Sequence, residues 1–484
     1  TMNNSSKLKV LLIVSSFGRI YGSYKRIYKR GFLNPPLNLC YLASSIERKG
    51  HTAKIVDAEA EGLSIIEILN IAKLFKPDLI GITATSVDFD GAVPIIKMLK
   101  QKMPDVPIII GGTHISIFEN EVLEQIPEID YGCIGDGEDL ILELIDTMLQ
   151  GNNEEIDNIK GLIYRKDGKI IQNSSRPMER DLDRYEFPAR HLLKNELYFR
   201  SIPYYGYKTT ASFMSSRGCP YKCVYCAAEK IRGGSQIRLR SVENVIEELE
   251  YIVNELGITH VAFNDDCLTI NKNRIYEICE EINSRGLKFT WEGLSRADLV
   301  EKELLLTMKK AGFVRMSYGI ESGDSNILRV LQKGETLDQI ESAFSMTKEA
   351  GIITRGSIII GSPYETRETV ENTFQFVRNL KGIDQVVINV LQPYPGTKVR
   401  DMIISGEGGS RYIKNEGDYG YLQRFGKASI SVNDLTPKSL VFLQKWGFMR
   451  FYLRPKVIWN NFKITGFKVF LQDGFNFVRS IAGI

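Results

Sequence analysis

Two series of short apolar segments, each alternating with helix-period segments, constrain the fold of this chain more than any other feature. In the first series the apolar segments lie at residues 9–15, 53–57, 79–84, 107–112 and 131–135. Strands that are apolar on both faces and separated by helices form parallel sheets covered on both sides. Residues 8–150 are therefore predicted to form a doubly wound, Rossmann-like α/β domain that binds its ligand at the carboxyl ends of the strands.

The second series, residues 211–393, is predicted to contain six strand–helix units. Its strands are expected at residues 211–217, 260–265, 289–296, 314–321, 354–361 and 386–392. Since a closed TIM-type barrel needs eight such units, this pattern predicts an open, partial (β/α)6 barrel with its active site at the strand carboxyl ends. Residues 151–210 are interpreted as a linker with a hairpin, and residues 394–484 as a carboxyl-terminal α-rich cap.

The composition excludes several classes of protein. With 43% hydrophobic and 25% charged residues, this chain of 484 residues is neither disordered nor of low complexity. Its 62 Lys and Arg against 59 Asp and Glu give a net charge of +3, which is too small to indicate nucleic acid as a partner. No apolar stretch approaches the ~20 residues of a membrane span, and the first residues lack a signal-peptide pattern. A cytoplasmic location is therefore expected.

Three cysteines are clustered directly after the first strand of the second series. Cys219, Cys223 and Cys226 have the spacing C-x3-C-x2-C, whereas the other four cysteines are scattered in apolar or helical contexts typical of a core. A structural zinc site uses four protein ligands, and a [4Fe–4S] cluster has four irons to ligate. Three thiolates leave one iron open to an exogenous ligand, which indicates a catalytic cluster. The alternative is a zinc site completed by a remote His or Cys.

This cysteine motif, with the aromatic Tyr225 before its last cysteine, resembles that of the radical S-adenosylmethionine superfamily. The resemblance implies a [4Fe–4S] cluster whose open iron binds S-adenosylmethionine, which is then cleaved to a 5′-deoxyadenosyl radical. A turn at residues 361–366 is similar to the family's G-x-P-G-E-T, with Tyr364 in place of a glycine. The implied S-adenosylmethionine-binding residues are Tyr225, Asp265, Asp266, Arg296, Gly319, Glu321 and Ser357.

Each of these residues also has a simpler interpretation. Asp265 and Asp266 are suited to capping the next segment, Arg296 to an ordinary ion pair, and Glu321 to a solvated or capping position. The specificity of the prediction comes from several matches that follow one another at successive strand ends.

The strand-end loops of the first series are rich in small residues and glycine, which provides a shallow floor for a wide, flat ligand. They lack the G-x-G-x-x-G motif of a dinucleotide-binding fold. Together with the helix start at residues 35–43, they resemble the cobalamin-binding domain of cobalamin-dependent radical S-adenosylmethionine enzymes. The implied cobalamin-binding residues are Ser15, Ser16, Phe17, Thr85, Ser86, Gly111, Gly112, Thr113, His114, Gly135, Gly137 and Glu138. The alternative is a degenerate Rossmann-like domain that has lost its ligand.

One motif of many cobalamin domains is absent. The D-x-H-x-x-G sequence, whose histidine ligates cobalt from below, does not occur in this chain. His114 is then either a substitute lower ligand or, as we favour from its turn context, a residue that bonds the backbone or a corrin side chain.

The resemblance implies a methyltransferase that acts on an unactivated carbon of a small-molecule, lipid or natural-product substrate, by way of methylcobalamin and the 5′-deoxyadenosyl radical. The alternatives are radical cyclisation, ring rearrangement or oxidation without methyl transfer, and a binding module without turnover. An electron donor such as flavodoxin or ferredoxin is the implied protein partner.

The carboxyl-terminal tail is basic and aromatic from residue 441 onward. A packed cap over the barrel mouth is favoured, because six strand–helix units leave an edge to cover. The other interpretations are contact of Arg450, Arg454 and Lys456 with an anionic substrate, and peripheral contact with a membrane surface.

Overall fold

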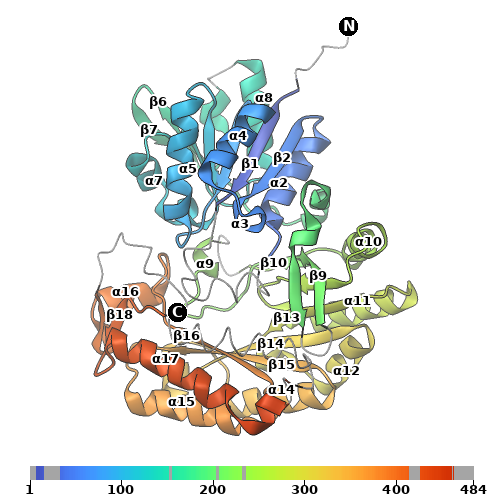
Figure 1. The fold of residues 1–484 in the computed structure, drawn as a ribbon, viewed down its shortest axis with the longest axis vertical. Coiled ribbons are helices and arrows are strands. Elements are labelled where there is room, and N and C mark those ends of the chain that lie inside the picture. Colours follow the sequence, from blue (N-terminus) through green and yellow to red (C-terminus); the bar gives the residue numbers. More distant parts are fainter. Residues whose placement is uncertain are drawn as a thin grey trace. The chain divides into compact units, whose positions relative to one another are not determined.

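A computed structural model describes residues 7–15, 33–151, 155–202, 206–231, 236–413, 426–459 and 462. The chain divides into two compact units (Figure 1). The first consists mainly of Pro35–Leu197, and the second mainly of Tyr198–Glu229 and Gly234–Ile484. The predicted fold class, a Rossmann-like sheet followed by a partial barrel, is confirmed.

The first unit is built on a seven-stranded sheet with the strand order β2-β1-β3-β4-β5-β6-β7. Its strands are β1 (Lys9–Val14), β2 (Thr52–Asp57), β3 (Leu79–Thr83), β4 (Ile108–Gly111), β5 (Tyr131–Cys133), β6 (Leu162–Lys166) and β7 (Lys169–Gln172). The first five are parallel, as predicted, and β6 and β7 add an antiparallel hairpin. The sequence placed this hairpin in a linker. It belongs instead to the sheet, because the fully buried Leu162 and Ile163 continue the apolar surface of β5.

Helices cover both faces of this sheet. They are α2 (Leu37–Arg48), α3 (Ala58–Glu61), α4 (Ile65–Phe75), α5 (Phe89–Lys102), α6 (Thr113–Phe118), α7 (Asn120–Gln125) and α8 (Glu138–Gln150). Two separate apolar cores result, one under α4 and α5 and the other under α2 and α8. Cys40 and Cys133 are buried in the second of these cores, as their apolar contexts predicted.

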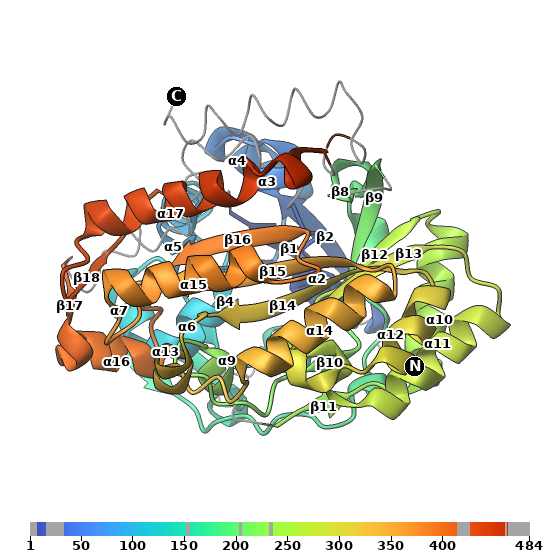
Figure 2. The same ribbon diagram turned by 90° about the horizontal axis from the view of Figure 1, so that it is seen from below.

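The second unit is built on a sheet of six parallel strands with one antiparallel edge strand, β8 (Figure 2). Its strand order is β16-β15-β14-β13-β12-β9-β8. The strands are β8 (Phe199–Ile202), β9 (Gly206–Phe213), β12 (His260–Phe263), β13 (Thr290–Ser295), β14 (Phe313–Glu321), β15 (Ile353–Ile360) and β16 (Gln385–Val390). Two small ribbons pair β10 (Ser216–Arg217) with β11 (Arg238–Leu239), and β17 (Ser410–Tyr412) with β18 (Ile430–Val432).

The outer face of this sheet is covered by α10 (Val242–Glu250), α11 (Lys272–Ser284), α12 (Lys302–Lys310), α14 (Leu337–Glu349) and α15 (Arg367–Asn379) (Figure 1). Helix α17 (Pro437–Tyr452) lies along β16, and the shorter helices α9 (Ala228–Ile231), α13 (Ser325–Val330) and α16 (Lys398–Ile404) lie in the loops that follow β10, β14 and β16. A ladder of four rings from neighbouring strands begins the shared core, with centroids 4.6, 4.8 and 4.6 Å apart: Phe213, Phe263, Trp291 and Phe313. None of the helices within the described ranges combines the length and apolarity needed to cross a bilayer.

Helix α17 covers the open edge of the sheet, the edge that the sequence analysis expected to need cover. A cap over the barrel mouth stays a prediction. Gln444 donates its side-chain amide to the Ile388 carbonyl (2.8 Å). The Tyr452 hydroxyl accepts a hydrogen bond from the Val386 amide (3.1 Å) and donates one to the Val386 carbonyl (2.9 Å). Side chains thus take the place of a further strand along β16. The last part of the predicted cap, residues 463–484, lies outside the described residues.

Replacing Tyr452 with Phe tests this edge. The change leaves a buried amide and carbonyl of Val386 without the hydroxyl, so we expect the free energy of unfolding to fall by about 1–3 kcal/mol. Tyr364→Phe is the matched control, since its half-exposed hydroxyl contacts only Glu407 at 3.3 Å among the described residues. Urea unfolding of both variants measures the difference. Equal stability of the two variants would contradict the assignment of Tyr452 to the edge.

Candidate cofactor site

The cysteine loop, residues 218–226, follows β9 and β10 at the carboxyl end of the parallel strands. Main-chain bonds tie its centre to the barrel: the Val224 amide donates to the Leu331 carbonyl (3.1 Å), and the Val399 amide donates to the Val224 carbonyl (2.9 Å). Gly218 has a φ of +96°, and a Cβ there would lie 2.2 Å from a main-chain oxygen. Only glycine fits this position, so a close approach to the main chain of Gln236 sets the course of the loop at its start.

Two carboxylates at the end of β12 hold the start of the loop. Asp265 accepts hydrogen bonds from the Ser215 amide (3.2 Å) and from the hydroxyls of Ser215 (2.7 Å) and Ser216 (2.5 Å). Asp266 accepts one from the Gly218 amide (3.0 Å). Both carboxylates therefore anchor the loop, which agrees with the simpler interpretation of these residues. Their direct contact with S-adenosylmethionine stays a prediction.

The thiols of Cys219, Cys223 and Cys226 lie close enough to interact electrostatically. Cys219 is partly buried, and this burial raises the pKa of its thiol, whereas Cys226 is exposed. Within the described ranges, no three His, Cys, Asp or Glu side chains converge as ligands of a single metal ion would. The three cysteines of a [4Fe–4S] cluster each bind a different iron, so such convergence is not required of them. The donor set fits a cluster held by three thiolates.

Cys267 is the other cysteine near this loop. It is buried, its Sγ lies 4.0 Å from the Ser295 hydroxyl, and burial raises its pKa to about 11. The thiolate, not the thiol, binds metal, so Cys267 is poorly suited to be a fourth ligand. Its core position agrees with the sequence analysis.

Glu321 is a buried carboxylate at the end of β14, beside the cysteine loop. Its φ is +61°, and a β-bulge separates it from Gly319 in the pairing with β15. The carboxylate folds back over Gly319, where a Cβ would lie 2.2 Å from Oε1. The Tyr225 hydroxyl donates to Oε1 at 3.0 Å, and the Lys333 ammonium lies 3.6 Å from it. The structure therefore brings together three residues predicted to bind S-adenosylmethionine.

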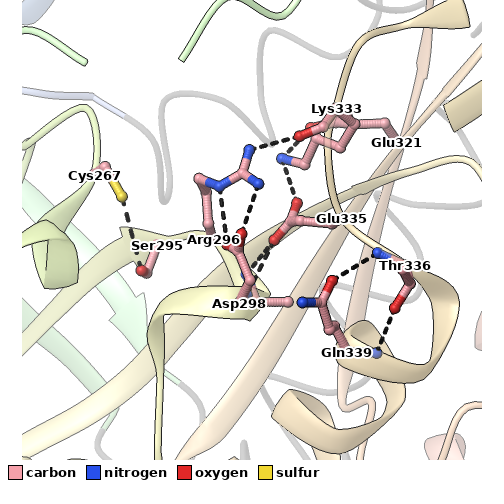
Figure 3. A network of polar contacts seen from close by, with 10 residues as sticks. Cys267, Ser295, Arg296, Asp298, Glu321, Lys333, Glu335, Thr336 and Gln339 are labelled. Carbon is pink, nitrogen blue, oxygen red and sulfur yellow. Dashed lines mark hydrogen bonds and ion pairs between the residues drawn. The ribbon is translucent and has the colours of Figure 1, made fainter. Parts of the chain in front are cut away.

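Arg296 is buried at the end of β13, in the network shown in Figure 3. It donates to both carboxylate oxygens of Asp298 at 2.9 Å and to the Lys333 carbonyl at 2.7 Å. Its guanidinium carbon lies 3.7 Å from the centroid of the Tyr221 ring, in the cysteine loop. The ion pair agrees with the simpler interpretation of Arg296, and its predicted pairing with the carboxylate of S-adenosylmethionine stays a prediction.

Two charged residues that the sequence analysis missed complete this network (Figure 3). The Lys333 ammonium lies 3.1 Å from Glu335, whose carboxylate accepts hydrogen bonds from the amides of Ala297 (2.5 Å) and Asp298 (3.3 Å). The segment looked like an ordinary helix start, because Thr336 forms a capping box with Gln339. Opposite charges two residues apart, just before a capping box, were the one signal that marked it.

Ser357 lies on β15, in register with Gly319 and on the face away from the helices. The Asn389 amide donates to its hydroxyl at 3.1 Å. Its contact with S-adenosylmethionine stays a prediction.

In the first unit, His114 is packed into the end of the sheet. Its Nδ1 lies 3.1 Å from the Ser86 hydroxyl, and its ring stacks on Phe89 with the centroids 3.9 Å apart. Phe118 lies on it at 4.7 Å. Burial lowers its pKa to about 4, so the ring is neutral at pH 7. These contacts are with side chains, and the predicted bond of His114 to backbone or to a corrin side chain stays a prediction.

The other predicted cobalamin residues shape the strand-end loops. Thr85 donates its amide (2.5 Å) and its hydroxyl (2.7 Å) to Asp88, whose pKa burial raises to about 6. Gly112 has a φ of +100°, and a Cβ there would lie 2.4 Å from the Ala84 carbonyl oxygen. Gly135 has a φ of +82° with nothing within 4 Å of its Cβ position, which leaves room above the turn for a flat ligand.

The remaining predicted residues occupy the same strand ends. Gly111 ends β4, Thr113 begins α6, Gly137 caps α8, and Ser15 and Glu138 are buried. Ser16 and Phe17 lie outside the described residues. The loops fit a ligand bound mainly through backbone groups and packing, and no side chain described here stands out as a ligand to cobalt. Cobalamin binding by these particular residues stays a prediction.

Comparison with known proteins identifies a family for each of the two units. Residues 213–377 match the radical SAM superfamily, and residues 26–145 match the B12 binding domain. An uncharacterized methyltransferase of Pyrococcus horikoshii, PH0819, is 33% identical over 478 residues, which is 99% of this chain and 98% of that protein. The anaerobic magnesium-protoporphyrin IX monomethyl ester cyclase of Rubrivivax gelatinosus is 31% identical over 71% of this chain and 62% of its own length.

A solved structure shares the fold of the whole chain. It is the cobalamin-dependent S-adenosylmethionine radical enzyme OxsB, with aqua-cobalamin and S-adenosylmethionine bound. The TM-score is 0.76 at 18% identity, over 99% of this chain and 72% of that one. With both domains matched in order and a full-length relative at 33% identity, the chain belongs to the cobalamin-dependent radical S-adenosylmethionine enzymes, which use a [4Fe–4S] cluster, S-adenosylmethionine and cobalamin.

Proposed function

We propose that this protein methylates an unactivated carbon of a small-molecule or lipid substrate. The observation that carries the proposal is the full-length similarity to a protein named a methyltransferase, through both domains and the carboxyl-terminal region. When bound, the cluster and cobalamin supply the electron and the methyl group for this chemistry.

The side chains of this chain have three tasks in the proposed reaction. Cys219, Cys223 and Cys226 hold the cluster and leave one iron open. Glu321 accepts hydrogen bonds from the ammonium or ribose hydroxyls of S-adenosylmethionine, because its carboxylate is buried and already oriented by Tyr225. Preorganised groups of this kind spare the site the reorganisation that a loose side chain would need.

Arg296 orients the same molecule in the proposal. Its guanidinium is fixed by Asp298 and by the ring of Tyr221, so it offers positive charge to a carboxylate at a defined place. Asp265 and Asp266 act one step removed, since they hold the cysteine loop that carries Tyr221.

A radical cyclisation without methyl transfer is the second candidate function. The similarity to a cyclase over 71% of this chain favours it. Both candidates use the same cofactors, and their products separate them.

Three further expectations complete the proposal. Reduced flavodoxin or ferredoxin is the proposed electron donor, and the cytoplasm the proposed location. A peripheral contact of the tail with a membrane is supported by the exposed Phe442, Trp446 and Leu453 on or next to α17, close to the basic residue Lys456. Retention of the protein on anionic vesicles tests that contact.

Product analysis tests methylation directly. We expect the anaerobically reconstituted protein, given S-adenosylmethionine with a labelled methyl group, a reductant and a cell extract, to form S-adenosylhomocysteine and 5′-deoxyadenosine in equal amounts. A labelled product should appear with them in mass spectra. Formation of 5′-deoxyadenosine alone would overturn methylation and support the cyclase candidate.

Replacing single cysteines tests the cluster site. Cys219→Ala, Cys223→Ala and Cys226→Ala should each lose most of the about four irons per chain of a reconstituted cluster and form no 5′-deoxyadenosine. Cys267→Ala is the matched control and should keep both. Iron content and visible absorbance give the measurement. A loss of iron in Cys267→Ala as large as in Cys219→Ala would contradict the three-thiolate assignment.

The packing of His114 supports the proposal that it is not a lower ligand of cobalt. We expect the electron paramagnetic resonance spectrum of the protein loaded with cob(II)alamin to lack splitting from an axial nitrogen. His114→Gln, which keeps a polar group facing Ser86, should leave the spectrum unchanged. Nitrogen splitting in the natural protein that disappears in His114→Gln would refute this assignment.

A further inference from the structure

One short loop of the second unit contacts the cysteine loop, Arg296 and Glu321. We call residues 331–336 the bridge loop; it connects α13 to α14. The Leu331 carbonyl accepts from the Val224 amide of the cysteine loop, and the Lys333 carbonyl accepts from Arg296. The Lys333 side chain lies between Glu321 and Glu335. The loop therefore links the cluster side of the site to both strand-end residues.

The residues on either side of Lys333 in the bridge loop have a left-handed backbone, and Lys333 itself is buried. Gln332 and Gly334, on either side of it, have φ values of +50° and +71°. Left-handed backbone at a non-glycine residue is costly and persists only where the surroundings impose it. Lys333 is only 6% exposed. Lysine is almost never buried to this extent unless it is paired with an opposite charge. Within this site left-handed backbone at a non-glycine residue occurs at Gln332 and at Glu321, the two positions that bring the Lys333 ammonium and its carboxylate together.

The charges around Lys333 are unequal. Figure 3 shows two cations, Arg296 and Lys333, facing three carboxylates, Asp298, Glu321 and Glu335. Arg296 is saturated by the two oxygens of Asp298, and Lys333 lies nearer to Glu335 (3.1 Å) than to Glu321 (3.6 Å). One negative charge is thus in excess, and it lies at Glu321. An excess buried carboxylate is suited to a cationic ligand.

Burial raises the pKa of Glu321, and the Lys333 ammonium opposes that rise. The carboxylate and the ammonium both lie over Gly319, where a Cβ would lie 2.2 Å from the Glu321 oxygen and 2.9 Å from Lys333 Nζ. Glycine therefore provides the space in which the two groups meet.

We propose that Lys333 is a positioning residue for S-adenosylmethionine: it holds the Glu321 carboxylate where the cationic part of that molecule binds, and the bridge loop links this carboxylate to the cysteine loop. The inference rests on the proposed binding role of Glu321 and assigns the function of a residue outside the cysteine motif and the strand ends. Lys333 itself does not touch the reacting atoms.

Binding of S-adenosylmethionine to the reconstituted holoenzyme, measured by equilibrium dialysis, tests the proposal. Lys333→Met should raise the dissociation constant about 10- to 100-fold, the range expected when a buried charged partner is removed. Lys333→Arg, which keeps the charge, should recover most of the affinity. Iron content and cobalamin binding should stay at the level of the natural protein in both variants.

A double-mutant cycle distinguishes positioning from general support of the fold. If Lys333 acts through Glu321, then Lys333→Met combined with Glu321→Gln binds no more weakly than Glu321→Gln alone. Additive losses would overturn the proposal. Recovery of binding in Lys333→Met combined with Glu335→Gln would also overturn it, because Lys333 would then serve only to neutralise Glu335.

A second variant and the choice of a binding measurement keep the test of Lys333 conclusive. If Lys333→Met fails to load the cluster, Lys333→Gln enters the same cycle, since it retains a donor of similar length. The binding measurement needs no substrate, so it is independent of methylation. A protein that binds S-adenosylmethionine but yields no labelled product disproves the proposed function and leaves the cycle to decide the role of Lys333.

Discussion

Burial of charge at the carboxyl ends of the strands is the constraint on which the second unit depends. A carboxylate or ammonium removed from water is stable only where hydrogen-bond donors or an opposite charge replace the lost hydration. Each buried charge at the site meets that condition through a different segment: Asp265 through the serines after β9, and Glu321 through Tyr225 and Lys333. Satisfying these charges forces loops that are distant in sequence to meet. The same contacts that make the charges tolerable therefore assemble the site.

The sequence was most informative where a period or a spacing is repeated. Five parallel strands of the first unit and six of the second follow from apolar alternation, because burial on both faces leaves little choice of residue. The cysteine motif predicts a cluster site equally well, because three thiols within eight residues rarely serve any purpose other than binding metal. Strand β8 and the place of the β6–β7 hairpin were not predicted, because short edge strands carry only a weak pattern and their pairing is decided by the strand they meet.

At the site, the sequence predicted which residues lie at the strand ends but not which groups they contact. Asp265, Arg296 and Glu321 are where successive strand ends placed them, but which groups they bond depends on loops without periodicity. Lys333 and Glu335 were missed for this reason, since nothing local distinguishes a buried ion pair from one in solvent. In the first unit, His114 looked like a turn residue, whereas its aromatic neighbours Phe89 and Phe118 come from two separate helices.

The covering of β16 by α17 has a consequence for how the molecule behaves among its copies. An exposed last strand is a template on which another chain can add a strand, and open sheets are prone to such growth. Because Gln444 and Tyr452 occupy the outward-facing groups of Ile388 and Val386, a second polypeptide finds no continuous row of donors and acceptors to copy. The half-barrel therefore ends in a protected edge, and this edge resists fibre-like association although the barrel is not closed.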